Sequence, residues 1–515
     1  MAKSRLENVF RNSGASLLNR IVTILINFII RTLFIRALGN EYTGISSLFT
    51  DILHVLSLVE MGLDVSMVYA LYKPIAEKDE KHIAALMNFY RVAFTLIGIS
   101  VLVFGLACVP FLQYIVKDVP NIKEDIRLIF IAYVVTTASS YFYVYKTVLI
   151  RADQKSSIIS NATTYTRLAE CLLEVILITV FREYFIYLIL HFLATIIRNF
   201  ILSAKAEKLY PEYLHNREVQ VSKEERKKLF LNIGALIIYT LSTVVLSGTD
   251  SIFISAFAGT TQVAIVGNFT MITNSVKNLI KMIVDSTRPS VGNMIATDKS
   301  NRQFVLFGHI NFLTFWVACF CSTCLFVLLN PFIGDIWFNS SYKVSMLIVG
   351  PIVLNFYIMV MTYAIGTFRN TNGLFVQGWY RPAVMSVLNI VLDFFMGKKW
   401  GVKGIYFATS ISLVTTQAWY DAFIVFKHAF FRKPWKYYYQ YLIYLGLTIL
   451  SCAGSYYLCS LITIPSIGGF ILKMLVAMCV PNLIVIAVFS RTDSFRYALG
   501  IANKLAKKVF RRLNK

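Results

Sequence analysis

Charged residues are scarce in this chain. Asp, Glu, Lys and Arg make up only 15% of its 515 residues and hydrophobic residues make up 57%, whereas soluble proteins carry about 25% charged and about 45–50% apolar residues. The polar gaps in the sequence are short. Water is therefore excluded as the main solvent of the protein, and the mean hydropathy of +0.64 leads to the same conclusion.

Motifs that indicate an enzyme are also missing. The sequence has no phosphate-binding loop, no dinucleotide-binding glycine fingerprint and no specific metal-site spacing. The spacing C-x-C-x-x-C occurs once, at Cys319, Cys321 and Cys324, but a helix spreads these thiols around its cylinder, so they are expected to be packing residues. We predict no catalytic residues, no metal and no cofactor. Energy for function must then come from an ion gradient, the membrane potential or a partner.

Long apolar segments fill most of the chain. About 20 helical residues cross a hydrocarbon core of about 30 Å, and lipid leaves no backbone group unpaired. We therefore predict an all-α polytopic membrane protein with about 14 transmembrane helices. The predicted spans are 15–38, 44–72, 85–111, 126–148, 156–181, 184–204, 229–257, 262–287, 303–329, 344–367, 374–396, 403–427, 438–460 and 467–490.

Basic residues are distributed unevenly over the loops. With a cytoplasmic N-terminus, the inside loops and both tails hold roughly 30 Lys and Arg and the outside loops hold fewer than ten. Both termini are therefore predicted to be cytoplasmic. This asymmetry accounts for much of the net charge of +23, so we predict no nucleic-acid partner. The tail 491–515 is predicted to form a basic amphipathic helix whose apolar face, which includes Phe495 and Leu499, contacts lipids of the inner leaflet.

An internal repeat suggests two halves. The sequence FIRALGNEYTGISSLFT, residues 34–50, resembles FISAFAGTTQVAIVGNFT, residues 253–270, in the same predicted orientation, as expected of parallel repeats. The longest inside loop separates the sixth and seventh spans. We predict an N-terminal lobe at 1–204, a cytoplasmic linker at 205–228, a C-terminal lobe at 229–437, two additional spans at 438–490 and a tail at 491–515.

Polar and basic residues form stripes on two spans, one in each of the two helix pairs that the repeat makes equivalent. On the first span the spacings of 7 and 11 residues fall within about 20° of one face. Charges at bilayer depth are costly and usually face a cavity or a partner. The residues on these stripes are Arg20, Asn27 and Arg31 on the first span, and Asn274, Lys277, Lys281 and Arg288 on the eighth.

Internal neutralisation is the alternative explanation of these stripes. Asp285 lies one helical turn from Lys281, and Glu60 or Asp64 on the second span could pair with Arg31. Both explanations stay open for any single residue.

Several carboxylates also lie within predicted spans. Such a group beside a cation can take up and release a proton or hold a cation, so H+ and Na+ are the candidate coupling ions. Asp250 aligns with Arg31 in the repeat. Arg381 precedes Pro382, which indicates a kink with either a bound substrate or a snorkelling Arg. The predicted ion-coupling residues are Glu60, Asp64, Asp250 and Asp393.

Four segments resemble a known family. They are LGNEYTGISSLFTDILHVLSLVEMGLDVSMVYALYKPIAEKD from Leu38, RADQKSSIIS from Arg151, TDSIFISAFAG from Thr249 and KKWGVKGIYFATSIS from Lys398. They are similar to polysaccharide transport proteins, the Wzx-type flippases of the multidrug/oligosaccharidyl-lipid/polysaccharide exporter superfamily. The resemblance implies two pseudo-symmetric six-helix lobes followed by two C-terminal helices.

The resemblance also implies a function. Wzx-type proteins move an undecaprenyl-diphosphate-linked oligosaccharide across the bacterial cytoplasmic membrane by alternating access, for capsule, O-antigen or exopolysaccharide export. The basic stripes would then hold the diphosphate. Polysaccharide polymerase and glycosyltransferase machinery are the implied protein partners. The alternatives are a lipid II flippase, a cation-coupled drug antiporter of the same superfamily and, with less support from the short outside loops, a membrane glycosyltransferase or polymerase.

Overall fold

The described part of the chain is almost entirely helical. The computed structural model describes residues 22–56, 67–68, 70–71, 74–75, 77–116, 122–153, 155–216, 219–227, 248–285, 287, 291, 300–374, 377–378, 380–462 and 467–500. Strands are absent from these ranges, and seven of their helices are long and apolar enough to cross a membrane. The predicted class, an all-α multi-pass membrane protein, is confirmed.

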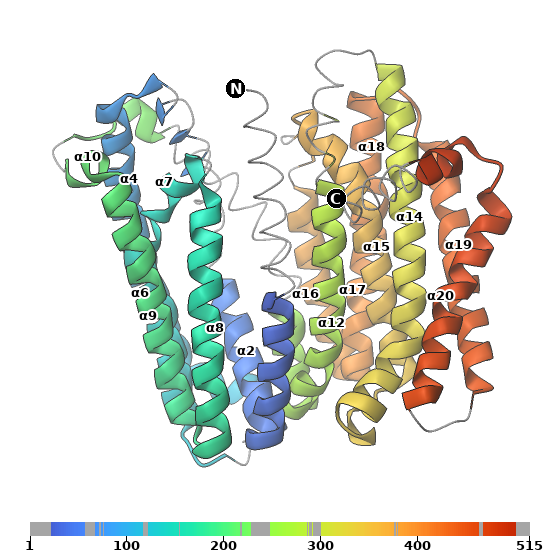
Figure 1. Cartoon of the computed structure of the whole chain (residues 1–515), viewed down its shortest axis with the longest axis horizontal. Helices are drawn as coiled ribbons and strands as arrows, with labels where there is room; N and C mark the ends of the chain where they lie inside the picture. The colour runs from blue at the N-terminus through green and yellow to red at the C-terminus, as the bar shows by residue number, and fades with distance from the viewer. Residues whose placement is uncertain are drawn as a thin grey trace, which may run out of the picture. The chain divides into compact units, whose positions relative to one another are not determined.

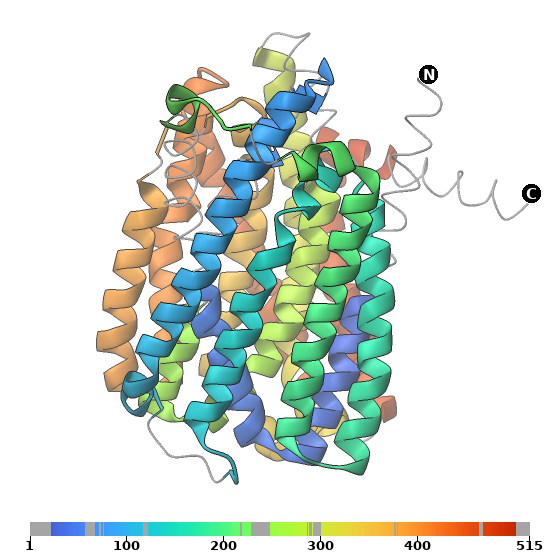
Figure 2. The same cartoon turned by 90° about the vertical axis from the view of Figure 1, so that its left-hand side faces the viewer.

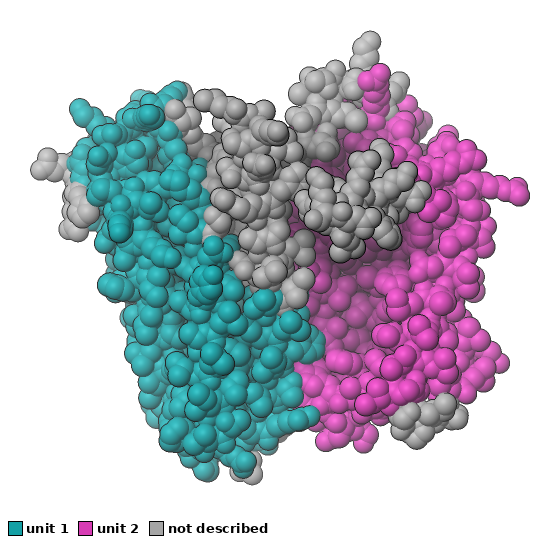
Figure 3. Space-filling model, in the orientation of Figure 1, with its two compact units in different colours: residues 1–264 teal, residues 265–515 magenta. Residues whose placement is uncertain are grey.

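The chain divides into two compact units. Unit 1 comprises residues 1–264 and unit 2 comprises residues 265–515 (Figure 3). The division falls within helix α12 (Thr260–Asp285). The lobe boundaries expected from the sequence stay predictions, because residues 228–247 lie outside the described ranges.

Unit 1 is a bundle of long helices. Helices α4, α6 and α9 run side by side, and α8 packs against α9 (Figures 1 and 2). Side-chain caps begin two of these helices: Asp79 accepts a hydrogen bond from the amide of His82, and Asp125 from that of Arg127. The elements are the helix 22–38, α2 (Asn40–Leu56), α4 (Glu80–Cys108), a 3-10 turn (Val109–Phe111), α5 (Leu112–Ile115), α6 (Ile126–Val144), α7 (Thr147–Ala152), α8 (Ser156–Val180), α9 (Tyr184–Leu209), α10 (Pro211–His215) and the helical segments 223–227 and 248–258.

Two apolar clusters form the core of unit 1. One surrounds Tyr90 and Phe94 of α4, which are fully buried. The other surrounds Phe49 of α2 and Phe130 of α6, whose rings meet edge to face at 4.9 Å. Aromatic side chains therefore fix α2 and α4 against α6.

The segment predicted as a linker is largely folded against unit 1. We call residues 205–216 and 219–227 the strap. The Asn88 side chain on α4 donates to the carbonyls of Asn216 at 2.8 Å and Val219 at 3.0 Å. The Tyr210 hydroxyl donates to Asp153 at 2.7 Å, and burial together with this hydrogen bond raises the pKa of Tyr210. The described part of the linker is thus a fixed element of the N-terminal unit.

The two repeat segments turn in the same way. Gly39 lies between the helix 22–38 and α2, and Gly259 lies between the helix 248–258 and α12. Both have positive φ angles, +95° and +89°, which glycine adopts without steric cost. Close approach accompanies the turns, because a Cβ atom on Gly44 would lie 2.1 Å from the carbonyl oxygen of Thr260.

Unit 2 is built around α14. This helix packs against α15 on one side and against α19 and α20 on others, while α16 pairs with α17 (Figure 1). Gly401 has a φ of +61° and joins α16 to α17. The elements after α12 are α14 (Ser300–Pro331), a π-helical turn (Phe332–Trp337), a 3-10 turn (Ser340–Tyr342), α15 (Met346–Thr371), α16 (Arg381–Trp400), α17 (Val402–Ser412), a π-helical turn (Leu413–Gln417), α18 (Ala418–His428), α19 (Trp435–Ser460), α20 (Ile467–Phe489) and the helical segment 493–500.

The first part of the basic tail packs on α14. The Phe495 ring stacks on Trp316 with centroids 5.3 Å apart, and Tyr497 stacks on His309 at 4.4 Å. Phe495 is therefore 6% exposed, although the helical pattern placed it on the lipid-facing side. Leu499 on the same predicted face stays 45% exposed. Residues 501–515 lie outside the described ranges.

Candidate functional site

The eighth predicted span carries a continuous polar stripe on α12. Asn274, Asn278 and Lys281 are exposed, and Lys277 is half-buried. Their spacing of i, i+3, i+4 and i+7 places them on one helical face. We call these four residues the α12 stripe. The sequence analysis identified three of them and missed Asn278.

The opposite side of α12 is apolar. Ile283 is 64% exposed, and at 100° per residue it lies about 160° around the helix from Lys281. An exposed Ile suits contact with lipid, whereas basic and amide side chains in a span face water or a polar ligand. The α12 stripe is thus suited to a hydrated, anion-binding surface.

Arg31 on the helix 22–38 is tied to its neighbours. Its Nη1 donates to the Ser47 hydroxyl on α2 at 3.0 Å, and its Nη2 donates to the carbonyl of Ala264 on α12 at 3.1 Å. Asn27, one turn earlier, is exposed. Arg31 therefore joins the helix 22–38 to α2 and to the first turns of α12, so its positive charge serves packing as well as any ligand. Arg20, the third residue of the predicted stripe, lies outside the described residues.

Internal neutralisation explains only part of this charge. Lys281 makes no ion pair within the described ranges. Asp250 is half-buried in the helix 248–258, and the next residue, Ser251, hydrogen-bonds Asp51 of α2. Three other predicted site residues, Glu60, Asp64 and Arg288, lie outside the described residues.

Asp393 lies in a fully buried polar group in unit 2. The Asn389 amide on α16 donates to the Asp393 carboxylate and to the Thr409 hydroxyl on α17, both at 3.3 Å. Asp393 and Asn389 are 0% exposed. The side-chain carbonyl oxygen of Asn389 has no hydrogen-bond partner among the described residues. This group gathers oxygen atoms of the kind that hard cations prefer.

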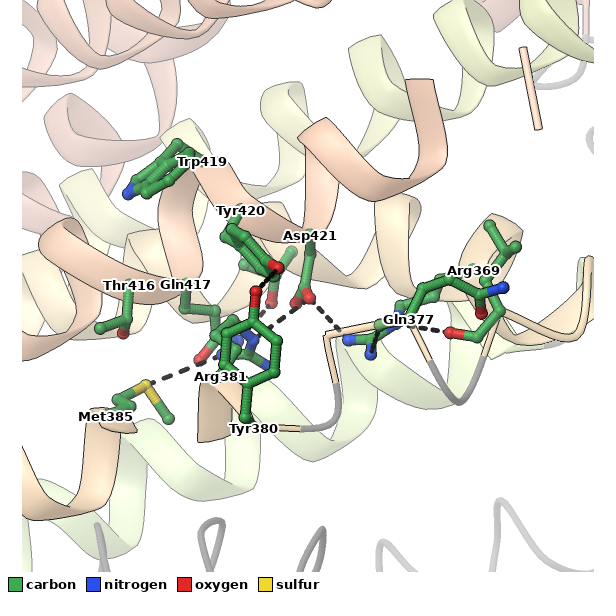
Figure 4. Close-up of polar contacts among 12 residues, drawn as sticks. Arg369, Gln377, Tyr380, Arg381, Met385, Thr416, Gln417, Trp419, Tyr420 and Asp421 are labelled. Atoms are coloured by element: carbon green, nitrogen blue, oxygen red, sulfur yellow. Dashed lines mark hydrogen bonds and ion pairs between the residues drawn. The ribbon is translucent and has the colours of Figure 1, made fainter. Parts of the chain in front are cut away.

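A second group in unit 2 joins three helices (Figure 4). The Arg369 guanidinium on α15 donates to Asp421 of α18 at 2.6 Å and to the carbonyls of Leu374 at 3.1 Å and Gln377 at 2.9 Å. Arg381 of α16 pairs with the same Asp421 oxygen at 3.2 Å. All three charged side chains are less than 10% exposed. We call Arg369, Arg381 and Asp421 the arginine cluster.

The arginine cluster corrects the expectation for Pro382. This proline lies in the first turn of α16, where its missing amide breaks no helical hydrogen bond, so it starts a helix instead of kinking one. Arg381 does not snorkel, because its side chain is 8% exposed.

A third charged group lies in unit 1. Arg167 of α8 contacts Glu170 at 2.9 Å and Glu174 at 3.3 Å. Two side chains of α9 approach Glu170, with His191 Nδ1 at 2.9 Å and Arg198 at 3.6 Å. We call these five residues the α8–α9 cluster.

Only a partial signal for these groups is visible in the sequence. The glutamates stand four residues apart on a predicted span, which places them on one face, but nothing in the sequence identifies His191 and Arg198 as their partners. Arg369 lies just beyond the predicted span 344–367, where basic residues are common, and Asp421 lies within the predicted span 403–427, but nothing in the sequence pairs the two.

The comparisons with known proteins give a family from the sequence and a fold from the structure. A sequence profile described as Polysaccharide biosynthesis protein matches residues 9–293, more than half of the chain. No curated protein matches the sequence.

Solved membrane transporters share the fold. The lipid II flippase MurJ in an inward closed conformation is 12% identical with a TM-score of 0.66, over 93% of this chain and 98% of that one. A mutant of the Vibrio cholerae MATE transporter VcmN is 13% identical with a TM-score of 0.57, over 84% and 99%. A MOP superfamily transporter from Pyrococcus furiosus is 13% identical with a TM-score of 0.53, over 79% and 92%. The chain therefore belongs to the polysaccharide biosynthesis protein family, as its sequence resemblance predicted, and has the fold of the MurJ and MATE transporters.

Proposed function

We propose that this transporter flips an undecaprenyl-diphosphate-linked oligosaccharide across the membrane for capsule, O-antigen or exopolysaccharide export. The observation that carries the proposal is the α12 stripe, a basic and amide surface on a helix that the sequence predicts to span the membrane. A diphosphate-sugar head group does not enter hydrocarbon unaided, and cations beside amides offer it both charge and hydrogen bonds. We assign diphosphate binding to the predicted residues Arg20, Asn27, Arg31, Asn274, Lys277, Lys281 and Arg288, with Asn278 added.

Coupling to an ion gradient is assigned first to Asp393. Asn389 donates to this carboxylate and to the hydroxyl of Thr409, and the oxygens of these three side chains suit Na+ or a transferable proton. Asp64, Asp250 and Glu60 stay predicted coupling residues. Asp393→Asn is expected to remove the dependence of flipping on the gradient of the coupling ion while the protein still inserts.

The charge of the α12 stripe also bears on the alternative functions. A lipid II flippase handles a diphosphate-linked lipid, so the α12 stripe suits it equally, and only the sugar distinguishes it. A drug antiporter for cationic solutes is disfavoured, because Lys281 and Lys277 repel a cation. An enzyme that synthesises or polymerises glycans has no support from the solved structures of this fold reported above, which are a flippase and two transporters.

The location that suits this function is the bacterial cytoplasmic membrane with both termini inside. The strap would then be cytoplasmic, and a thiol introduced by His215→Cys should resist labelling from outside intact cells. Labelling there would reverse the orientation. Contact with a polysaccharide polymerase or glycosyltransferase stays a prediction.

The test is a flipping assay in vesicles with a double variant, Lys277→Gln with Lys281→Gln. It should accumulate normally and lose at least about tenfold in flipping, because two desolvated cation contacts contribute more than about 1.4 kcal/mol. Lys277→Arg should be tolerated better, since charge matters more than shape for a diphosphate.

The matched control makes the same charge change on exposed lysines of α16 and α17, as Lys399→Gln with Lys403→Gln. It should flip normally. Equal losses in both double variants would show a general charge effect and would count against the α12 stripe as the binding surface. Arg31→Gln should also lower stability, because Arg31 joins three helices.

A further inference from the structure

The α8–α9 cluster places its carboxylates deeper than its cations. The side chains of Glu170 and Glu174 are 1% and 0% exposed, whereas Arg167 is 20% exposed and His191 is 35% exposed. With His191 neutral, two arginines balance two glutamates and the net charge is zero. A buried cluster of this composition lies close to the point at which one carboxylate is more stable as the neutral acid.

The two glutamates are compensated unequally. Glu170 has three partners, namely Arg167, His191 and Arg198. Glu174 has ion-pair contact with Arg167 alone among the described residues. One carboxylate oxygen of each glutamate accepts no hydrogen bond, so the difference between the two lies in their number of ion-pair partners. The titratable groups that face Glu174 are Arg167, Glu170 and Cys171 on α8, His191 and Tyr187 on α9, and Tyr133 on α6.

A proton fits this cluster better than a metal ion. One ligand atom each from Glu170, Glu174 and His191 lies within 4.8 Å of the others, which is the spacing of a cation site. The guanidinium of Arg167 already lies between the carboxylates, 2.9 Å from one and 3.3 Å from the other. A metal ion would have to displace that charge, whereas a proton binds to a carboxylate oxygen without displacing anything.

We infer that the α8–α9 cluster is a proton site, in which Glu174 takes up one proton from water as a neutral acid and returns it to water during transport. His191 is the accessible member and gives the proton its route to the buried carboxylates. Protonation of Glu174 leaves Arg167 with Glu170 as its only charged partner in the cluster and changes the net charge of the cluster from zero to +1.

An aromatic path links this site to the helix that carries Arg31. The His191 ring stacks on Tyr187 with centroids 6.2 Å apart. Tyr187 meets Phe34 edge to face at 5.1 Å, and Phe34 lies one turn beyond Arg31. Proton binding that shifts His191 therefore acts on the helix 22–38. This role in transport rests on the proposed function, but the proton site itself does not.

The proton site is tested without substrate. Infrared difference spectra of the purified protein in nanodiscs are recorded between roughly pH 5 and pH 8. We expect a band of a protonated carboxyl group that disappears in Glu174→Gln and shifts in Glu174→Asp. The control is Glu183→Gln at the start of α9, where the side chain is 47% exposed, and it should keep the band. A band unchanged in both Glu174 variants would overturn the proposal.

Two further measurements separate the possible failures. If Zn2+ or Mn2+ raised the melting temperature of the wild type but not of His191→Gln, the cluster would be a metal site and the proposed proton site would be rejected. In vesicles, Glu174→Gln should lose stimulation of flipping by a proton gradient, and unchanged stimulation would overturn the transport role. If the wild type flips no lipid-linked oligosaccharide while the Glu174 band behaves as expected, the proposed function fails and the proton site stands.

Discussion

The α8–α9 cluster and the arginine cluster use the same residue types to different ends. In unit 1, two buried glutamates face two arginines and a histidine, and the cations are the more exposed members. In unit 2, two buried arginines share one carboxylate of Asp421. An arginine stays charged at every accessible pH, whereas a buried glutamate can become neutral.

This difference means that the α8–α9 cluster can change its charge, whereas the arginine cluster is a permanent contact between helices. Arg369 also donates to two carbonyls of the segment before α16, so the arginine cluster holds backbone as well as charge. In the α8–α9 cluster, the hydrogen bonds within the described chain connect side chains to one another. The α8–α9 cluster can change its protonation, and the arginine cluster can only form or break.

The largest expected effect is the loss of stability in the variant Asp421→Asn. Asp421→Asn leaves two buried guanidinium groups without a charged partner, and breaking a buried ion pair costs about 3–5 kcal/mol. We expect a large fall in the melting temperature of the solubilised protein. The control is Asp335→Asn, which removes an exposed ion pair. The side chain of Asp335 is 55% exposed and that of its partner Lys343 is 41% exposed. If both variants have the same melting temperature, Asp421 does not stabilise the contact between α15, α16 and α18.

The two glutamates of unit 1 should differ from each other. Glu170→Gln removes the carboxylate that three side chains share, and we expect a loss of about 2–3 kcal/mol in the free energy of unfolding. Glu174→Gln should cost less than about 1 kcal/mol, because Arg167 keeps Glu170 and an amide resembles the protonated acid. Thermal unfolding of the two variants at one pH checks the order. The reverse order would contradict Glu174 as the proton carrier.

Two glycines beside the arginine cluster form a matched pair. Gly378 and Gly373 have φ angles of +74° and +68°, so alanine is strained at both. A Cβ atom on Gly378 would lie 2.6 Å from the Tyr420 ring, whereas nothing lies within 4 Å at Gly373. Gly378→Ala should cost about 1–3 kcal/mol and Gly373→Ala about 1 kcal/mol. Equal melting temperatures would mean that Tyr420 does not pack on the loop.

The smallest effect is expected at the strap. His82 contacts Glu225 at 2.9 Å, with both side chains about one-third exposed, and exposed ion pairs contribute less than about 1 kcal/mol. His82→Gln should therefore leave the melting temperature nearly unchanged. Asn88→Ala should have more effect, because it removes two hydrogen bonds to the strap backbone. Limited proteolysis of the strap would detect the difference.

Hydrophobic periodicity predicted most helices closely. The span expected at 467–490 is α20 at Ile467–Phe489, and the one expected at 156–181 is α8 at Ser156–Val180. Length and apolar content determine such segments locally. The polar side of α12 was also predictable, because a helix places residues three and four apart on one face.

The contacts of these residues with other helices could not be predicted from the sequence. Glu170 was visible as a carboxylate in a span, but His191 reaches it only through the packing of α8 on α9. Arg381 was expected at a kink, because nothing local shows that Asp421, forty residues later, lies beside it. Phe495 was placed toward lipid for the same reason, since its Trp316 neighbour lies on a distant helix.

The most direct measurement compares substrates in one vesicle preparation of the wild-type protein. An undecaprenyl-diphosphate-linked oligosaccharide, the same oligosaccharide on undecaprenyl monophosphate and a cationic drug are each followed across the bilayer. We predict rapid flipping of the diphosphate-linked lipid, at least about tenfold slower flipping of the monophosphate because one anionic group is lost, and no drug transport. Drug transport without flipping of either lipid would contradict the proposed function.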